Sequence, residues 1–212
     1  MLQDEFDDIS SDLNRLNALS DGVISIAMTL LVFNFKVPEL GMDAPSDQVY
    51  QAVLQQIPAL ISVIIAFLSI GVWWLAHKRI MRNIARYDRK LAMMNLLFLL
   101  IIALIPFAAA LMGQFPLHNL FRTLVFALLG SLGAVLSSIW KYAERKGFVR
   151  EYVTPELSRF LVARARAIGA TFMVTALAAI WAPHVASFIP MSIPLVVRVV
   201  HRAPAIESVS PS

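Results

Sequence analysis

Apolar residues along this chain gather into six long runs separated by short polar or charged stretches. The runs lie at 14–36, 55–76, 91–112, 119–141, 160–182 and 187–201. A membrane-spanning helix needs about 20 mainly apolar residues, within a range of about 17–25. The first five runs satisfy this length, whereas the sixth is shorter and contains Pro190 and Pro194. The pattern predicts an all-α integral membrane protein with six transmembrane helices, the sixth kinked, tilted or only partly inserted.

The composition agrees with this class. Hydrophobic residues make up 58% of the chain, charged residues 15%, and the mean hydropathy is +0.71. Soluble domains are typically about 45–50% apolar and 25% charged. The sequence has no cysteine, which excludes disulfides and thiolate metal sites. The first eight residues are acidic where a cleavable signal peptide would be basic.

Basic residues fall almost entirely on one side of the expected bundle. Of the 18 Lys and Arg residues, only Lys36 and Arg122 fall on the other side. Those on the basic side are Arg15, Lys78, Arg79, Arg82, Arg86, Arg89, Lys90, Lys141, Arg145, Lys146, Arg150, Arg159, Arg164, Arg166, Arg198 and Arg202. Because basic loops stay cytoplasmic, we expect a multi-pass plasma-membrane protein with both termini inside. The net charge of +4 then implies no nucleic-acid partner.

The chain is expected to divide into three stretches. Residues 1–13 form an acidic cytoplasmic segment, 14–202 a single six-helix transmembrane domain, and 203–212 a Pro/Ser-rich disordered tail. We find no internal repeat and no soluble catalytic module. No serine lies in a nucleophile elbow, and the histidines are scattered without metal-ligand spacing. The sequence therefore predicts neither an enzyme nor a resident cofactor or metal.

Polar side chains interrupt the first apolar run at regular spacing. Asp21, Ser25 and Thr29 are four residues apart and therefore share one face of a helix. An ionisable group at the centre of a membrane helix costs about 2.5–3.5 kcal/mol on insertion scales, so it usually faces protein or water. This stripe is what a water-filled or ion-conducting path needs. It is equally what a helix packed tightly against its neighbours shows.

A second group of polar residues is expected at the same membrane depth. A Trp-x-x-His sequence ends the second run, and Asn95 begins the third. A buried carboxylate needs partners, so these side chains favour a hydrogen-bonded cluster with the first helix. The expected members are Arg15, Ser20, Asp21, Trp74, His77 and Asn95. The alternative is an interfacial aromatic belt in which His77 only reaches toward the headgroups.

Together these elements resemble the transmembrane protein 175 family of potassium channels. The order Arg-x-x-x-Leu-Ser-Asp, then Trp-x-x-His, then Asn and Pro-Phe carries the resemblance over about residues 15–113. Two positions depart from the family pattern. Leu19 stands where the family usually has Phe, and Ala109 stands where many members have Thr.

The resemblance implies a moderately selective potassium channel without a Thr-Val-Gly-Tyr-Gly filter, and this sequence has no such loop. Single-repeat members assemble as homotetramers whose first helices line the pore. By resemblance, Ile26 forms the hydrophobic constriction, with Leu30 and Phe33 as further apolar positions. Thr29, with Ser25 nearby, supplies a polar ring where potassium passes transiently.

Three alternatives remain open from the residues themselves. The apolar stripe of the first helix is also typical of a lipid-facing or core surface. Asp21 and His77 are suited to a proton relay in a secondary or proton-coupled transporter, although that class usually shows inverted repeats and broken helices. A structural membrane scaffold without transport is the third.

Overall fold

The computed structural model describes the backbone of residues 2–200 except 37, 39, 42, 183–185 and 187, and the side chains from residue 13 onward in that range. The tail expected at 203–212 lies outside the described residues. The acidic segment continues the first helix, because α1 begins at Leu2.

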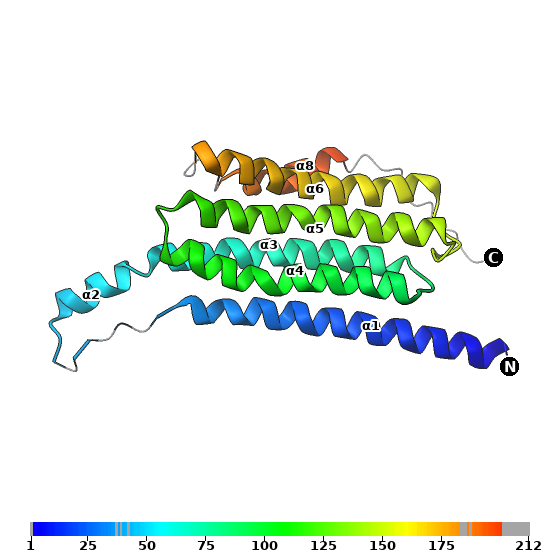
Figure 1. The fold of residues 1–212 in the computed structure, drawn as a ribbon, viewed down its shortest axis with the longest axis horizontal. Helices are drawn as coiled ribbons and strands as arrows, with labels where there is room; N and C mark the ends of the chain where they lie inside the picture. The colour runs from blue at the N-terminus through cyan, green and yellow to red at the C-terminus, as the bar shows by residue number, and fades with distance from the viewer. Residues whose placement is uncertain are drawn as a thin grey trace.

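The described chain is almost entirely helical. Its elements are α1 Leu2–Leu30, η1 Leu31–Asn34, α2 Ser46–Leu54, α3 Ile57–Arg82, α4 Arg89–Gln114, α5 Asn119–Arg145, α6 Pro155–Trp181, η2 Ile189–Ser192 and α8 Ile193–Val200. Figure 1 shows the long helices side by side along one common axis, with α1 at one edge of the bundle and α6 with α8 at the other. Helix α4 contacts α1, α3 and α5, and therefore forms the centre of the fold.

Five stretches are long and apolar enough to cross a membrane. They are Leu13–Asn34, Ser46–Arg82, Arg89–Gln114, Asn119–Arg145 and Pro155–Trp181. The sixth expected span is present as a shorter apolar helical stretch, Ile189–Val200, that packs on α6. Two prolines account for this, because Pro190 and Pro194 each lack the N–H that a continuous helix needs and each lies where a helical element begins. The predicted all-α membrane fold is thus confirmed, and within the described residues the sixth run forms a shorter helical stretch than the other five.

Two basic connections meet at one end of the bundle. The α3–α4 and α5–α6 connections both lie at the end from which α1 starts (Figure 1). An antiparallel bridge pairs Ile84 with Val149, and the N–H of Ala85 donates to the carbonyl of Phe148 at 2.7 Å. These bonds fasten the two connections to each other. The charge-based expectation that both basic loops share one side of the membrane therefore agrees with the fold.

Asp88 links this end to two helices. Its Oδ1 accepts from the N–H of Leu91 at 2.8 Å and so caps α4, while its Oδ2 accepts from the hydroxyl of Tyr142 on α5 at 2.5 Å. Hydrogen bonds to the ionised form favour it. The Tyr142 hydroxyl and then the Leu91 N–H accordingly hold the pKa of the Asp88 carboxyl below its ordinary value.

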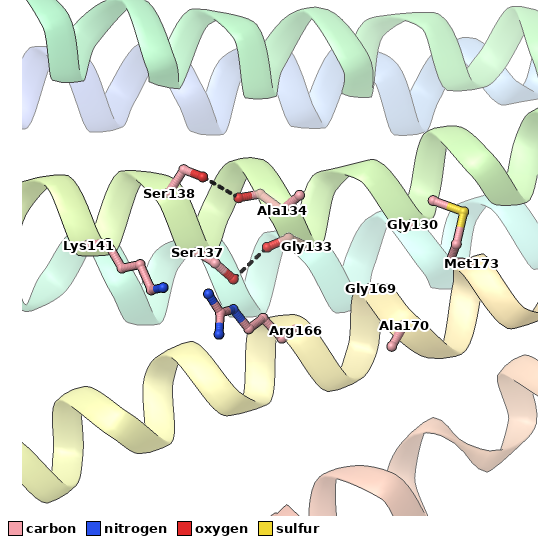
Figure 2. Close-up of a pocket in the computed structure, with 10 residues that line it drawn as sticks. All are labelled: Gly130, Gly133, Ala134, Ser137, Ser138, Lys141, Arg166, Gly169, Ala170 and Met173. Atoms are coloured by element: carbon pink, nitrogen blue, oxygen red, sulfur yellow. Dashed lines mark hydrogen bonds between the residues drawn. The ribbon is translucent and has the colours of Figure 1, made fainter.

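Helices α5 and α6 approach each other closely because glycines line their contact (Figure 2). A Cβ added at Gly133 would lie 2.7 Å from the Cα of Gly169 and 2.8 Å from the carbonyl oxygen of Ala165. Within a membrane, small residues let helix backbones pack at close range, where dispersion contacts replace the missing hydrophobic effect. The glycines therefore set the distance between α5 and α6.

Replacing Gly133 with Ala should force the two helices apart. We expect the Gly133→Ala variant to lose about 1–3 kcal/mol of unfolding free energy, because overpacking displaces backbone atoms. The measurement is chemical unfolding in detergent micelles, followed by circular dichroism.

The matched control is Gly71→Ala on α3, where the added methyl group meets nothing within 4 Å. This control should be neutral or slightly stabilising, because Ala favours helix over Gly by about 1 kcal/mol. Equal stability of the two variants would contradict the role assigned to the glycine contact.

Candidate pore-lining helix and its polar anchor

Helix α1 and the turn that follows it have two distinct faces. The inner face packs on the bundle through residues spaced three or four apart, all buried: Leu13, Leu16, Ser20, Ile24, Ala27 and Leu31. This spacing is that of one helix face. The inner face therefore fixes the rotation of α1 about its own axis.

The outer face carries the residues implied as pore-lining. Ile26 is 59% exposed, Leu30 44% and Phe33 77%, and Thr29 is exposed between them. Val23 packs partly against the core, whereas Ile26, Thr29 and Phe33 remain uncovered. Together, Ile26, Thr29, Leu30 and Phe33 form an uncovered surface, which we call the α1 stripe.

The hydroxyl side chains of Ser25 and Thr29 differ in their position relative to this stripe. The Thr29 hydroxyl lies within the stripe and donates to the carbonyl of Ile26 at 2.9 Å. Ser25 is exposed as well. It lies about 40° from Thr29 and about 100° from Ile26 around the helix, at the edge of the stripe. Thr29 therefore places its hydroxyl among the apolar residues, and Ser25 flanks them.

A buried hydrogen-bond chain joins α1 to α4 and α3. The Ser20 hydroxyl donates to the carbonyl of Leu16 at 2.9 Å and accepts from Nδ2 of Asn95 at 2.9 Å. Oδ1 of Asn95 lies 2.7 Å from Nε2 of His77. Because an amide oxygen only accepts, Nε2 of His77 is the donor in this arrangement. Ser20, Asn95 and His77 are each at most 2% exposed, so all three polar side chains depend on one another.

A further hydrogen bond lies beside the one between Ser20 and Asn95. Nε1 of Trp74 donates to Oδ1 of Asp21 at 2.8 Å, which joins α3 to α1 one residue after Ser20. The His77 ring stacks on Phe98 of α4, with ring centroids 4.8 Å apart. We call Ser20, Asp21, Trp74, His77 and Asn95 the polar anchor.

Arg15 does not join the polar anchor. It is exposed, and within the described part of the chain no hydrogen bond or ion pair connects it to these side chains. The reason is geometric, because Arg15 precedes Ser20 by five positions and so lies about 140° from it around α1. The expectation that Arg15 belongs to this network is corrected accordingly.

The other end of α1 has contacts that sequence reasoning missed. Nδ2 of Asn34 donates to the carbonyl of Pro106 at 3.5 Å, and Nζ of Lys36 lies 3.5 Å from Oε1 of Gln114. The sequence feature that could have indicated these contacts is the pair Asn34 and Lys36 at the end of the first apolar run. At 3.5 Å both contacts are weak, so the polar anchor is the stronger of the two attachments.

The described residues contain no group of three His, Asp or Glu side chains that converge as metal ligands. The polar anchor has the hydrogen-bonding pattern of a structural joint, because its buried groups bond to one another.

Comparison with known proteins agrees with these features. The sequence model described as the endosomal/lysosomal potassium channel TMEM175 matches residues 15–106, a range that contains the α1 stripe and the polar anchor. Over these residues the chain is similar to the TMEM175 family. It is 35% identical over 105 residues to a potassium channel of Streptomyces collinus, with 50% of each chain covered. It is 32% identical over 136 residues to a potassium channel of Chamaesiphon minutus, covering 63% of this chain and 66% of the relative.

The likeness to a solved structure extends over nearly the whole fold. A crystal structure described as a lysosomal potassium-selective channel TMEM175 homolog from Chamaesiphon minutus superposes with a TM-score of 0.75, covering 90% of this chain and 99% of that one. At 22% identity this likeness concerns the fold. The sequence matches span between half and two thirds of the prokaryotic relatives.

The polar anchor makes the stability of the fold sensitive to loss of the Asn95 side chain. The Asn95→Ala variant should lose about 1–3 kcal/mol of unfolding free energy, because Ser20 and His77 each lose a buried partner. The measurement is chemical unfolding in detergent micelles.

Asn119→Ala is the matched control, since Nδ2 of Asn119 donates to the carbonyl of Ile180 in an exposed position at 3.2 Å. Its effect should stay within about 0.5 kcal/mol. If Asn95→Ala were as mild as this control, the buried chain would not be what holds α1.

Proposed function

We propose that this chain is the subunit of a homotetrameric, moderately potassium-selective cation channel. The observation that carries the proposal is the α1 stripe, which is uncovered in the single chain although the opposite face of the same helix is anchored. Four copies of α1 around an axis would cover these side chains against one another. The prokaryotic relatives named potassium channels support the choice of ion.

In this mechanism the gate is hydrophobic. A narrow ring of Ile26 side chains expels water, and a cation then has to shed hydration in order to pass. A small tilt of α1 widens the ring and rewets it. Leu30 and Phe33 extend the apolar lining toward the side opposite the basic loops.

Selectivity in this mechanism is moderate. Hydroxyl oxygens of Thr29, with Ser25 at the flank, partly replace the lost water. Potassium sheds water at lower cost than sodium, so a weak field of hydroxyl oxygens favours potassium without the close carbonyl cage of filter-type channels. The permeant ion is thus bound only transiently near Thr29.

The membrane arrangement follows from charge. The end that carries both basic loops is placed in the cytoplasm by the positive-inside rule, with both termini there and the protein in the plasma membrane. The polar anchor then lies in the cytoplasmic half of α1, where it holds the helix against α3 and α4.

A secondary or proton-coupled transporter is the alternative. Such proteins typically bind substrate where helices break near the membrane midplane. The long helices described here run without interruption, including α4 through Pro106. Saturable, stoichiometrically coupled uptake would favour the transporter, and ohmic single-channel current would exclude it.

Ile26→Asn tests the gate directly. A polar side chain keeps the constriction wet, so we expect a severalfold rise in potassium flux into proteoliposomes and a loss of preference over sodium in bi-ionic recordings. Leu68→Asn on α3 is the matched control, because Leu68 is equally apolar and 63% exposed. Unchanged flux and selectivity in Ile26→Asn would count heavily against the proposal.

Asp21→Ala separates anchoring from conduction. Because Asp21 holds Trp74 at 2.8 Å, its loss should reduce the stability of the tetramer, measured by thermal dissociation in detergent, more than the ion preference. The reverse pattern would mean that Asp21 lines the ion path.

A further inference from the structure

The contact between α5 and α6 leaves two adjoining hollows on the surface of the bundle. The first has a volume of about 370 Å³, and its lining includes Gly130, Gly133, Ala134, Gly169 and Ala170. The second, of about 400 Å³, lies toward the basic end, where Pro155, Ser158 and Val162 line it. Lys141 and Arg166 line both hollows and therefore stand where the two meet.

The two cations converge at this junction. In Figure 2 the ammonium group of Lys141 and the guanidinium group of Arg166 point toward one another from α5 and α6. Within the part of the chain that the structure describes, neither side chain has a carboxylate partner. Two like charges at a membrane surface repel each other unless an anion lies between them.

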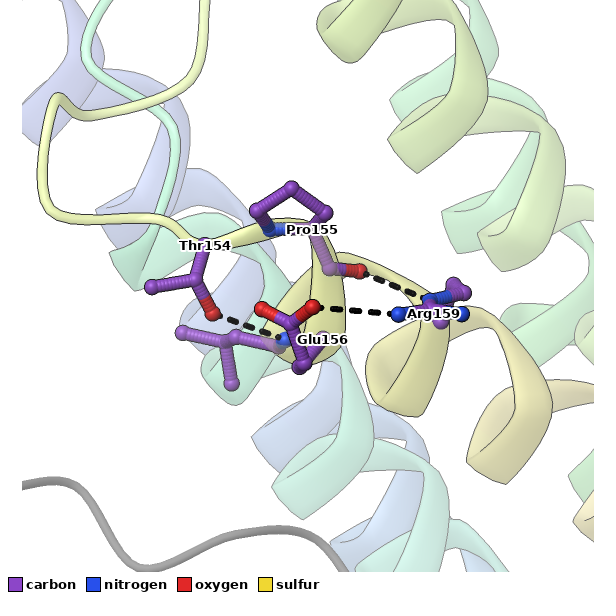
Figure 3. Close-up of polar contacts among 5 residues, drawn as sticks. Thr154, Pro155, Glu156 and Arg159 are labelled. Atoms are coloured by element: carbon purple, nitrogen blue, oxygen red, sulfur yellow. Dashed lines mark hydrogen bonds and ion pairs between the residues drawn. The ribbon is translucent and has the colours of Figure 1, made fainter.

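The neighbouring charged groups offset one another only in part. Arg159, which lines the second hollow, donates to Oε1 of Glu156 at 3.1 Å, as Figure 3 shows. Glu144 lines the same hollow, and its Oε1 accepts from the Ser158 hydroxyl at 2.5 Å. Glu144 keeps its negative charge, because the hydroxyl is a neutral partner. Lys141 and Arg166 together exceed it by one positive charge, which a ligand with an anionic group would neutralise.

The rest of the first hollow is suited to a hydrocarbon chain. Its glycines are explained by the close approach of α5 and α6, but Ala134 and Ala170 are exposed beside that contact and form a shallow apolar floor. The floor runs from the cations toward Met173, deeper in the membrane-spanning part of α6. Arg166 extends its charge along the helix toward the basic end, as long basic side chains do near a membrane interface.

We propose that this groove binds an anionic phospholipid of the leaflet that faces the basic loops. The phosphate lies between Lys141 and Arg166, and one acyl chain lies along Ala134 and Ala170. A free phosphate ion would satisfy the cations but would leave the apolar floor uncovered, which is why a lipid fits better. The binding is a property of the outer helices and does not rest on the proposed channel activity.

The test is lipid retention by the purified full-length protein, with phosphatidylglycerol as the probe and phosphatidylcholine for comparison. Native mass spectrometry counts the lipids bound, and thermal unfolding in detergent measures the stabilisation. Wild type should retain phosphatidylglycerol preferentially. The Lys141→Gln/Arg166→Gln variant should bind it roughly thirtyfold more weakly, because each basic residue near the surface contributes about a fivefold gain in affinity.

Arg145→Gln/Lys146→Gln is the matched control, because it removes the same charge from an exposed position at the end of α5. It should keep nearly the full preference for phosphatidylglycerol. Ala134→Phe tests the apolar floor separately, since it fills the groove and leaves both cations in place. This variant should retain less of the lipid. Because both cations remain, the binding that is left should still weaken as the salt concentration rises.

Several results would overturn the proposal. One is an equal loss of phosphatidylglycerol binding in the two charge variants. Another is retention of phosphatidylcholine by wild type as strong as that of phosphatidylglycerol. A third is stabilisation by inorganic phosphate that matches the stabilisation by the lipid. If Ala134→Phe dissociated the oligomer, the groove would be a contact with a second copy and the proposal would likewise fail. Ion flux is not the readout, so failure of the channel proposal is a separate outcome.

Discussion

The hydrogen bond from the Asn95 amide to the Ser20 hydroxyl is the contact on which the arrangement of α1 depends. It lies in the buried contact between α1 and α4, where unpaired polar groups are costly and well-paired ones specify a single geometry. Ser20 can meet Asn95 only when the inner face of α1 points at α4. That rotation in turn leaves Ile26, Thr29 and Phe33 outside. A short polar contact in one half of the helix thereby sets which apolar residues the other half exposes.

The two ends of α1 are held unequally. Near Ser20, three buried polar side chains and the Asp21–Trp74 pair join three helices at distances of 2.7–2.9 Å. Near Asn34, the polar contacts with α4 are at the limit of hydrogen-bonding distance. Helices α3 to α6 are restrained further by the backbone hydrogen bonds between the two basic connections and by the glycine contact between α5 and α6. The bundle is thus a firm frame to which α1 is attached mainly at one level.

The sequence predicted much of this arrangement. Run length and charge placement indicated the helices, their alternating direction and the common side of the basic loops. Helices of similar length that alternate in direction bring their ends to the same membrane depth. The positions of the polar residues along their runs were therefore enough to predict that one cluster contains Ser20, Asp21, Trp74, His77 and Asn95. The pairing of individual atoms was not predictable, since it depends on helix rotation. Arg15 shows the difference, because it has the right depth and the wrong face. The glycine contact depends on close packing, which spacing alone does not report, whereas the short sixth helical stretch was indicated by the length of its run and by its two prolines.

The orientation of the Thr29 hydroxyl affects whether a cation or an anion is favoured beside it. Its single proton is committed to the Ile26 carbonyl of its own helix. The oxygen therefore presents outward only lone pairs, with no donor left for an anion. In the proposed pore, a ring of such oxygens would favour a cation over an anion, so discrimination by charge sign would need no formal charge on the stripe.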